Sequence, residues 1–287
     1  MPAPLIESFF DPATSTLSHL VMDPETGQCA LVDSVLDYQP ASGRLHTDSA
    51  QRLLDRVEAL GATVQWILDT HLHADHLSAS AWLAERTGGR VGIGREVVQA
   101  QRHFGELFNA GPSFLTDGSQ FDHLFGADDT FFIGKQEVRA WHTPGHTQAC
   151  MTYLVGEAAF VGDTLFAPDF GTARCDFPGG DAIALYRSLQ RILSLPPQTR
   201  LYLCHDYRPG DRPVRPWVSV EEQRSSNLHL LQGKDEATFV ALRQARDREL
   251  APPTLLLPAV QVNMRAGHLP EPENNGVSYL KIPVRQR

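Results

Sequence analysis

The sequence is short of positive charge and has no basic cluster. Its 25 Lys and Arg residues stand against 34 Asp and Glu residues, which gives a formal net charge of −9. Because nucleic-acid binding needs a basic face that neutralises phosphates, this balance argues against a nucleic-acid partner. No apolar run approaches the roughly 20 residues that cross a bilayer, and residues 1–7 lack the basic segment and apolar core of a signal peptide. We therefore expect a cytoplasmic protein with no membrane partner.

Cysteine is scarce as well. The chain has four, with no CxxC spacing, and such a set in 287 residues does not suggest a disulfide framework. Cys29, Cys150 and Cys204 lie in strand-like apolar runs, so we expect them to be reduced core residues. Cys175 differs because it lies in a polar loop between Arg174 and Asp176, and its role stays open.

Apolar runs separated by Gly, Pro and polar turns make up most of the chain, of which 42% is hydrophobic. Strands are expected at 18–22, 29–33, 64–69, 91–94, 129–133, 137–141, 150–155, 158–161 and 200–204. Helices are expected from an N-cap at 48–49, at about 77–87, up to about 108, at 183–192 and at about 234–249. This order predicts two mixed sheets packed face to face and covered outside by helices. We assign residues 1–230 to one catalytic domain and residues 231–287 to a C-terminal helix and tail packed on it.

Three histidines and a carboxylate fall within seven residues directly after the apolar run at 64–69. The stretch reads Thr70-His71-Leu72-His73-Ala74-Asp75-His76. It occupies a strand-to-helix turn, where open α/β sheets present ligand-binding groups. Because burying so many polar groups without a metal would be costly, the stretch predicts a metal site.

Three further motifs place a ligand-type residue where an apolar strand ends. They contribute His146 in the segment 143–147, Asp163 after Gly162, and His205 after Cys204. The candidate ligands are then His71, His73, Asp75, His76, His146, Asp163 and His205. Imidazole and carboxylate suit zinc or iron(II), and the absence of cysteine argues against a purely structural zinc site. The set allows two metals with Asp163 bridging them. For the nearby His142 we expect a structural role.

The order and separation of these four motifs resemble the metallo-β-lactamase superfamily. The resemblance implies an α/β fold, the αβ/βα sandwich of two mixed sheets flanked by helices. That superfamily includes glyoxalase II, lactonases and RNA-processing nucleases, so the fold alone does not define the reaction.

Other segments resemble one family more specifically, the persulfide dioxygenases (sulfur dioxygenases), and match a bacterial subgroup of it. These segments are 162–166, 171–177, 205–207 and 263–267, so the resemblance covers almost the whole chain. It implies one iron(II) per chain held by His71, His146 and Asp163, the two-His-one-carboxylate arrangement. No catalytic residue is implied beyond these ligands. The residues His73, Asp75, His76 and His205 would line the pocket around the iron or, in a hydrolase, complete a second metal site.

The resemblance also implies an oxidoreductase of sulfide and persulfide detoxification, which converts glutathione persulfide, O2 and water to sulfite and glutathione. Arg174 and Tyr207 match glutathione contacts of glutathione-dependent relatives, and Arg265 is a third candidate for substrate binding. The segment between Asp163 and Arg174 is longer than in the mitochondrial branch, and Cys175 stands where that branch has threonine. The alternative is a two-zinc thioester or lactone hydrolase of the glyoxalase II type. Because family members are often dimers, a homodimer is a further expectation.

Overall fold

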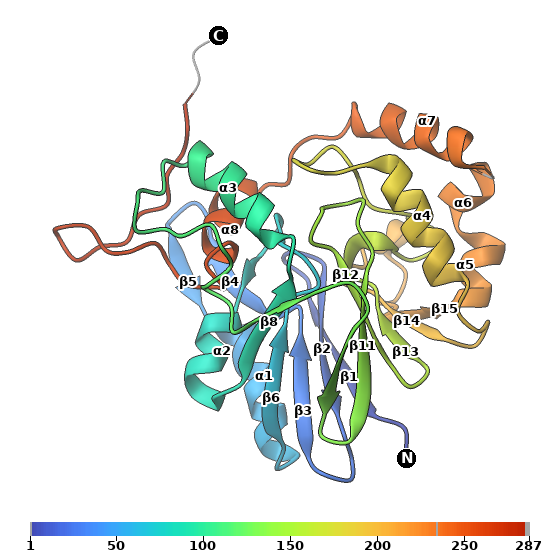
Figure 1. Ribbon diagram of the computed structural model, residues 1–287, viewed down its shortest axis with the longest axis horizontal. Coiled ribbons are helices and arrows are strands. Elements are labelled where there is room, and N and C mark those ends of the chain that lie inside the picture. Colours follow the sequence, from blue (N-terminus) through green and yellow to red (C-terminus); the bar gives the residue numbers. More distant parts are fainter. Residues whose placement is uncertain (1, 234, 285–287) are drawn as a thin grey trace.

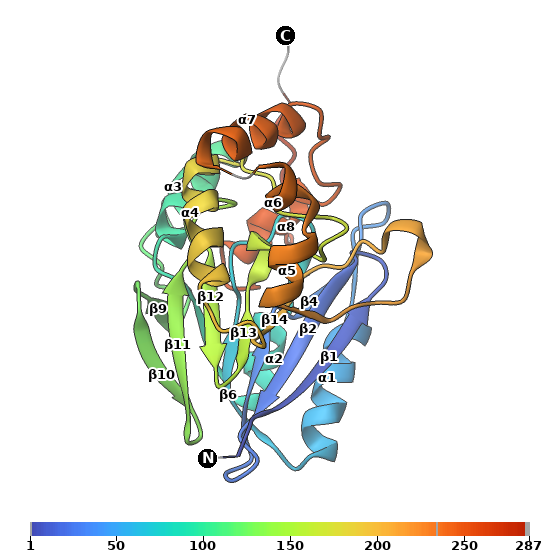
Figure 2. The same ribbon diagram turned by 90° about the vertical axis from the view of Figure 1, so that its right-hand side faces the viewer.

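The protein is a sandwich of two six-stranded sheets with helices on both outer faces (Figures 1 and 2). The computed structural model describes residues 2–233 and 235–284. A third sheet of three short strands joins the first half of the chain. This architecture confirms the αβ/βα sandwich expected from the motifs. No helix within the described ranges is long and apolar enough to cross a membrane.

The first sheet has the strand order β1-β2-β3-β6-β8-β9. Its strands are β1 (Leu5–Asp11), β2 (Thr16–Met22), β3 (Gln28–Val32), β6 (Thr63–Leu68), β8 (Arg90–Gly94) and β9 (His123–Phe125). β3, β6, β8 and β9 run parallel to one another, whereas β2 pairs antiparallel with both of its neighbours, β1 and β3. The small sheet, ordered β5-β4-β7, consists of β4 (Val35–Gln39), β5 (Arg44–His46) and β7 (Leu77–Ser78).

The second sheet follows the chain, in the order β10 to β15. Its strands are β10 (Asp129–Ile133), β11 (Gln136–His142), β12 (Met151–Val155), β13 (Ala158–Phe160), β14 (Arg200–Tyr202) and β15 (Trp217–Ser219). Only the β13–β14 pair is parallel. The crossover between these two strands contains a long loop and a helix, as a parallel connection requires.

Helices flank each sheet (Figure 1). The first half carries α1 (Asp48–Ala59), α2 (Ser80–Thr87), α3 (Val97–Leu107) and, from the end of the chain, α8 (Leu256–Asn263). The second half carries α4 (Ala182–Leu193), α5 (Val220–Ser226), α6 (Leu228–Gln232) and α7 (Glu236–Asp247), with the short 3-10 turns η1 (Gly162–Thr164) and η2 (Pro209–Asp211). The Asp181 carboxylate caps α4 by accepting from the backbone N–H groups of Ile183 and Ala184. Leu185, Leu189 and Ile192 form the buried stripe of α4.

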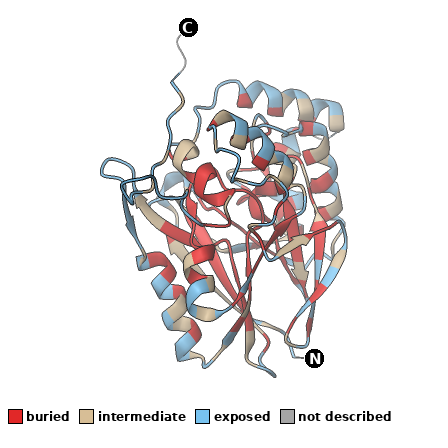
Figure 3. Ribbon diagram, turned by 60° about the vertical axis from the view of Figure 1, so that its left-hand side comes forward, coloured by how far each residue is buried: buried red, intermediate tan, exposed pale blue. Residues whose placement is uncertain are grey.

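Three apolar cores hold these layers together. The central core lies between the sheets and includes Leu68, Phe125, Phe131 and Tyr153. The outer cores lie between each sheet and its helices. Figure 3 shows the buried residues concentrated in the strands and on the inner faces of the helices. The expected helix at 77–87 starts later, at Ser80, because Leu77 and Ser78 pair with β4 instead.

The C-terminal segment packs on both halves of the sandwich. α8 contacts β7, and its residues Val260 and Val262 belong to the core of the first sheet. α7 packs against α4 on the other side. The expected division at residue 230 falls inside α6, so both halves of the sandwich receive helices from the last part of the chain.

Candidate metal centre

The predicted ligands come together from loops at one edge of the sandwich. The stretch containing His71, His73, Asp75 and His76 follows β6, and His146 lies in the turn between β11 and β12. Asp163 is carried by η1 after β13, and His205 follows β14. Because the carboxyl ends of parallel strands meet at the same edge of a sheet, strand order alone brings these loops close together.

A buried carboxylate after β3 fixes the start of the main loop. Asp33 accepts hydrogen bonds from the Thr70 backbone N–H at 2.7 Å and from the Thr70 hydroxyl at 3.0 Å. It also contacts His73 Nε2 at 3.0 Å. Burial opposes ionisation of Asp33, but the charge and hydrogen bond of His73, together with Thr70, lower its pKa. Burial likewise opposes protonation of His73, yet Asp33 and then Asp69 raise the pKa of His73 to about 9.

The tail braces the same loop from the other side through Asn263 at the end of α8. Its side-chain amide donates to the backbone carbonyls of His73 at 2.9 Å and His76 at 2.8 Å. Its carbonyl oxygen accepts from the backbone N–H of Ser78 at 2.7 Å. Asn263 is buried, so these bonds satisfy backbone groups that water does not reach. The tail thus holds the loop that carries the histidines.

His71, His146 and Asp163, here called the ligand triad, face one another without hydrogen-bonding. Asp163 Oδ2 lies 3.7 Å from His71 Nε2 and 3.6 Å from His146 Nε2, too long for hydrogen bonds. The other ring nitrogens are engaged, since His146 Nδ1 donates to the Arg174 carbonyl at 2.8 Å and His71 Nδ1 lies 3.1 Å from the Thr70 hydroxyl. Both Nε2 atoms therefore present their lone pairs to Asp163.

The ligand triad fits a metal ion. All three side chains are buried, and His71 Nε2 and Asp163 Oδ1 have no hydrogen-bond partner within the described structure. Their ligand atoms lie within 4.8 Å of one another. Unpaired buried polar atoms are costly, and a cation bound between two imidazoles and a carboxylate satisfies them.

His73, Asp75, His76 and His205, here called the paired cluster, also lie within metal-binding distance of one another. Each of its histidines contacts a carboxylate through one ring nitrogen, although His73 Nδ1, His76 Nε2 and His205 Nε2 form no hydrogen bond within the described structure. His205 Nε2 lies 3.0 Å from Asp75 Oδ2, and His76 Nδ1 lies 3.4 Å from Asp75 Oδ1. Burial opposes protonation of His205, but Asp75 and Asp163 raise its pKa to about 10.

Gly162 lets Asp163 approach the main loop. Its φ of +53° lies in the left-handed region, and a Cβ there would meet the Thr70 hydroxyl at 2.6 Å. A side chain at this position would therefore be strained and would also push η1 away from Thr70 and His71. The Gly-Asp pair seen in the sequence is thus explained by close packing of two loops.

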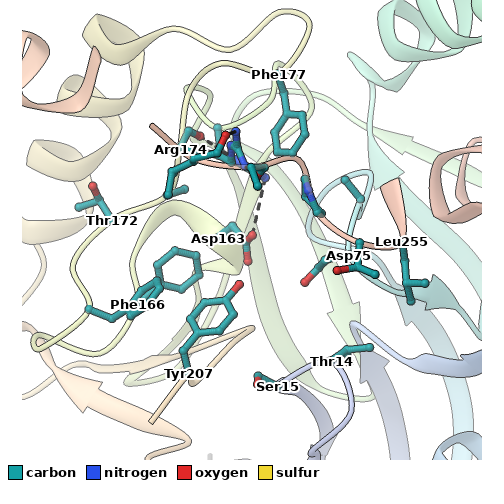
Figure 4. A pocket seen from close by; sticks show the side chains of 18 of the residues that line it. Thr14, Ser15, Asp75, Asp163, Phe166, Thr172, Arg174, Phe177, Tyr207 and Leu255 are labelled. Atoms are coloured by element: carbon teal, nitrogen blue, oxygen red, sulfur yellow. Dashed lines mark hydrogen bonds and ion pairs between the residues drawn. The ribbon is translucent and has the colours of Figure 1, made fainter. Parts of the chain in front are cut away.

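A cavity of about 620 Å³ opens onto the metal centre (Figure 4). Asp75, His146 and Asp163 line the cavity at the metal centre. Aromatic walls are formed by Phe166, Phe170, Phe177 and Tyr207, and α7 with its connection to α8 contributes Arg243, Arg246, Leu250 and Leu255. This volume is typical of pockets that take a small molecule or a short peptide.

Tyr207 and Arg174 both line this cavity, as a substrate contact requires. Figure 4 shows the Tyr207 hydroxyl directed toward Asp163 and Asp75. The Tyr207 ring packs against Phe166 and Phe170. Arg174 is engaged in the protein itself, because its guanidinium forms two bonds to the Asp176 carboxylate at 2.6 and 2.7 Å and one to the Ala251 carbonyl at 2.7 Å.

Arg265 does not join these residues. It lies over the Phe114 ring, donates to the Gln261 carbonyl and lines a different hollow beside the C-terminal tail. The neighbouring Asn263, from the same motif, is the residue that reaches the metal loop. The tail motif therefore contacts the metal loop through the asparagine, and its arginine lies elsewhere.

The remaining candidates have structural surroundings. His142 Nε2 lies 2.7 Å from the Gln148 carbonyl, in keeping with the structural role expected for it. All four cysteines are free and buried, which confirms the expectation for Cys29, Cys150 and Cys204. Cys175 is buried too, contrary to its polar sequence context, because α7 packs over its loop and the Asp247 carboxylate accepts from its backbone N–H. Burial, the largest cause, raises the pKa of its thiol.

Two carboxylates of the centre were not predicted as functional. Asp33 anchors Thr70 and His73, and Asp69 accepts from the hydroxyls of Ser78 and Ser80. Both follow an apolar strand immediately, which is the same signal that identified Asp163 and His205. Applied to every strand, that signal would have found them.

A buried His/Asp centre at the loop edge of an αβ/βα sandwich defines a metal-dependent enzyme fold. The chain belongs to the metallo-β-lactamase superfamily, whose family model matches residues 13–205.

Relatives named as hydrolases are strongly similar to the chain. It is 59% identical to a probable metallo-hydrolase of Burkholderia pseudomallei, over 97% of this chain and 98% of that protein. It is 52% identical to a beta-lactamase hydrolase-like protein of Agrobacterium fabrum over 98% of this chain. In that second case the chain spans only 65% of the relative's length.

More distant similarity links the chain to persulfide dioxygenases. It is 28% identical to the human mitochondrial persulfide dioxygenase ETHE1, over 92% of this chain and 89% of that protein. The crystal structure of ETHE1 from Myxococcus xanthus superposes with a TM-score of 0.73 at 30% identity, covering 92% of this chain and all of that one.

Proposed function

We propose that this protein is an iron(II)-dependent persulfide dioxygenase that acts on glutathione persulfide. The overall reaction is glutathione persulfide plus O2 plus water to glutathione, sulfite and protons. The outer sulfur is oxidised, O2 is reduced, and the sulfur–sulfur bond breaks to release the glutathione thiol. Similarity to ETHE1 over nearly the whole chain supports this proposal.

The observation that carries the proposal is the difference between the ligand triad and the paired cluster. Two imidazoles and one carboxylate of the triad are unpaired among themselves and buried, as the ligand set of a non-haem iron site requires. In the paired cluster, His205 and His76 contact Asp75, and His73 contacts Asp33. We infer that the triad holds the iron and that the paired cluster, whose histidines lie 3.0–3.4 Å from Asp75 or Asp33, stays a charge-paired wall beside it.

When bound, iron(II) supplies a redox-active centre for the reaction of dioxygen with sulfur. The chain's own groups orient the ligands and shape the cavity. The Arg174 carbonyl fixes the ring of His146, and Thr70 fixes that of His71. His205 Nε2 and Asp75 Oδ2 lie 3.0 Å apart at the cavity, where the pair can hold a proton next to the substrate.

The aromatic walls fit the thiol-bearing part of such a substrate. Phe166, Phe177 and Tyr207 line the cavity beside Asp163 and give the sulfur-bearing part of the substrate an apolar surface to pack against. The Tyr207 hydroxyl faces the metal end, where it can donate to a polar group of the substrate. We propose that Tyr207 positions the substrate and does not bind the metal.

A second candidate is a two-zinc hydrolase of thioesters or lactones. It is favoured by the four ligand-type side chains of the paired cluster, which lie close enough to hold an ion. The hydrolase names of the more similar relatives also support it. Such an enzyme would need Asp75 to exchange its histidine contacts for a metal, and would then use zinc to lower the pKa of a bound water.

Oxygen uptake distinguishes the two functions. Metal-free protein is reconstituted with iron(II) or with zinc, and each form is given glutathione persulfide in an oxygen electrode and a glutathione thioester in a spectrophotometer. We expect oxygen uptake and sulfite only from the iron form. Thioester hydrolysis by the zinc form, with no oxygen uptake by the iron form, would establish the hydrolase instead.

A further inference from the structure

The cavity at the metal centre contains more positive charge than the sequence motifs indicated. Three arginines line it: Arg174, Arg243 and Arg246. Arg174 comes from the loop after η1, and Arg243 and Arg246 come from α7. Since the metal end of the cavity contributes Asp75 and Asp163, an anionic substrate is repelled there before a metal binds and attracted toward the arginines.

Two of the three arginines are neutralised by the protein. Arg174 makes a two-bond contact with the Asp176 carboxylate. Arg243 is buried, contacts the Asp247 carboxylate at 2.7 Å and donates to the Thr172 carbonyl at 3.1 Å. A buried pair of this kind is disrupted only at a large cost, so Arg243 is not available to a ligand.

Arg246 differs from both. It lies in the last turn of α7, is exposed, and within the described residues its side chain forms no ion pair or hydrogen bond. Its charge nevertheless reaches the cavity wall. Burial, followed by the charges of Arg243 and Arg246, lowers the pKa of His229, another lining residue, to about 3.

We propose that Arg246 is the counter-ion for a carboxylate of the substrate's glutathione moiety. This inference takes its ligand from the proposed function. Glutathione carries two carboxylates, and a planar guanidinium binds a carboxylate through two parallel hydrogen bonds. Because Arg174 and Arg243 are already paired with carboxylates of the protein, Arg246 is the cavity arginine whose charge an incoming anion neutralises. It determines specificity for the peptide part of the substrate and lies outside the reacting centre.

A matched pair of variants tests the assignment. Arg246→Gln removes the charge while keeping a good helix former. Arg248→Gln removes the same charge two residues further on, from a side chain that lines a separate hollow with Cys175 and Asp181. Binding of glutathione and of its diethyl ester to the iron-loaded protein is measured by calorimetry. KM and kcat for glutathione persulfide are measured in parallel.

We expect Arg246→Gln to weaken glutathione binding and raise KM about tenfold, with kcat unchanged, because one charge-assisted contact is worth roughly this factor. Arg248→Gln should stay within about twofold of the wild type, and Arg246→Lys should restore part of the loss. Binding of the diethyl ester, which has no carboxylate, should be equally weak in the wild type and Arg246→Gln, since neither can form the ion pair.

Two results would overturn the assignment: an unchanged affinity in Arg246→Gln, or an equal loss for glutathione and its ester. The same data separate this inference from the proposed function. If the iron protein takes up no oxygen but glutathione binding still depends on Arg246, the dioxygenase proposal fails and the carboxylate site stands. If oxygen uptake is normal and Arg246→Gln behaves as the wild type, only the carboxylate site fails.

Discussion

The ligand triad and the paired cluster use the same side-chain types and lie within one buried centre, yet their polar atoms have different neighbours. In the triad, His71 and His146 have one ring nitrogen engaged and the other directed at Asp163. In the paired cluster, Asp75 lies between His76 and His205 and contacts both. The difference shows that the number of ligand-type residues does not by itself give the number of metal ions bound. What matters is how closely each histidine already contacts a carboxylate, at 3.6–3.7 Å in the triad and at 3.0–3.4 Å in the paired cluster.

The largest loss of metal and activity should come from removing Asp163, the one carboxylate of the triad. Asp163→Ala takes away one of three ligands, so we expect the protein to lose its iron and at least about a thousandfold of its oxygen uptake. Metal analysis after gel filtration and an oxygen electrode measure the two losses. His71→Ala should behave in the same way. Retention of a full complement of iron in either variant would contradict the assignment of the triad.

Asn263→Ala should damage both clusters together, because Asn263 braces the loop that carries three of the histidines. The substitution leaves the carbonyls of His73 and His76 and the N–H of Ser78 without partners. We expect a loss of about 2–5 kcal/mol in unfolding free energy and a metal affinity lower by about ten- to a hundredfold.

Arg265→Ala is the control for Asn263→Ala, since Arg265 comes from the same segment but lines another hollow. Denaturant titration and metal competition with a chelator measure the two quantities. Similar losses in both variants would mean that the tail acts through general stability and that the amide of Asn263 has no particular role.

A change in the paired cluster should have a smaller effect. His76→Gln removes one contact of Asp75 without removing a triad ligand. We expect iron to remain bound and kcat to fall about tenfold, the effect of disturbing groups around a metal. Parallel measurement of iron content and kcat shows whether His76 is a metal ligand or a neighbour of the metal site. Loss of metal from His76→Gln, comparable to that from Asp163→Ala, would show that the paired cluster is a ligand set.

The smallest expected effect is on the pH dependence of folding stability, and it comes from a buried histidine that has no carboxylate partner within the described residues. His229 accepts from the Thr172 backbone N–H at Nδ1, and burial, then Arg243 and Arg246, lower its pKa to about 3. As pH falls below the unfolded value of about 6.5, the unfolded chain binds a proton that the folded protein rejects, so stability falls. From pH 7 to pH 5.5 the loss from this group is about 1 kcal/mol.

The variant His229→Gln should lack this part of the acid sensitivity, as measured by urea unfolding at the two pH values. Identical pH slopes for the variant and the wild type would show that His229 is not the group responsible.

The fold and the identity of the candidate ligands were readable from the sequence because both depend on local pattern. His71, Asp163 and His205 each come three residues after a strand with an apolar end, and His146 comes four residues after β11, in which polar and apolar residues alternate. Strand order then brings the loops together without further information. This is why the sandwich agrees with expectation and why the predicted ligands lie at one edge of it.

The sequence does not reveal contacts between segments that lie far apart in the chain. The brace from Asn263 to the loop at 71–78, the burial of Cys175 beneath α7 and the arginines of the cavity depend on how the last helices dock. Edge elements were also missed, such as β1, β4 and β5, because short or half-exposed strands have a weak apolar alternation. The charge of Arg265 favours ligand binding as the interpretation of this motif, whereas in the structure the amide of Asn263 supports the backbone of the metal loop.

An anaerobic titration of metal-free protein with iron(II) tests the central claim most directly, with oxygen uptake on glutathione persulfide measured at each point. If the triad alone holds the metal, tight binding and activity both reach their plateau at one iron per chain. A plateau of both at two metals per chain would contradict this account, because the paired cluster would then be a second metal site.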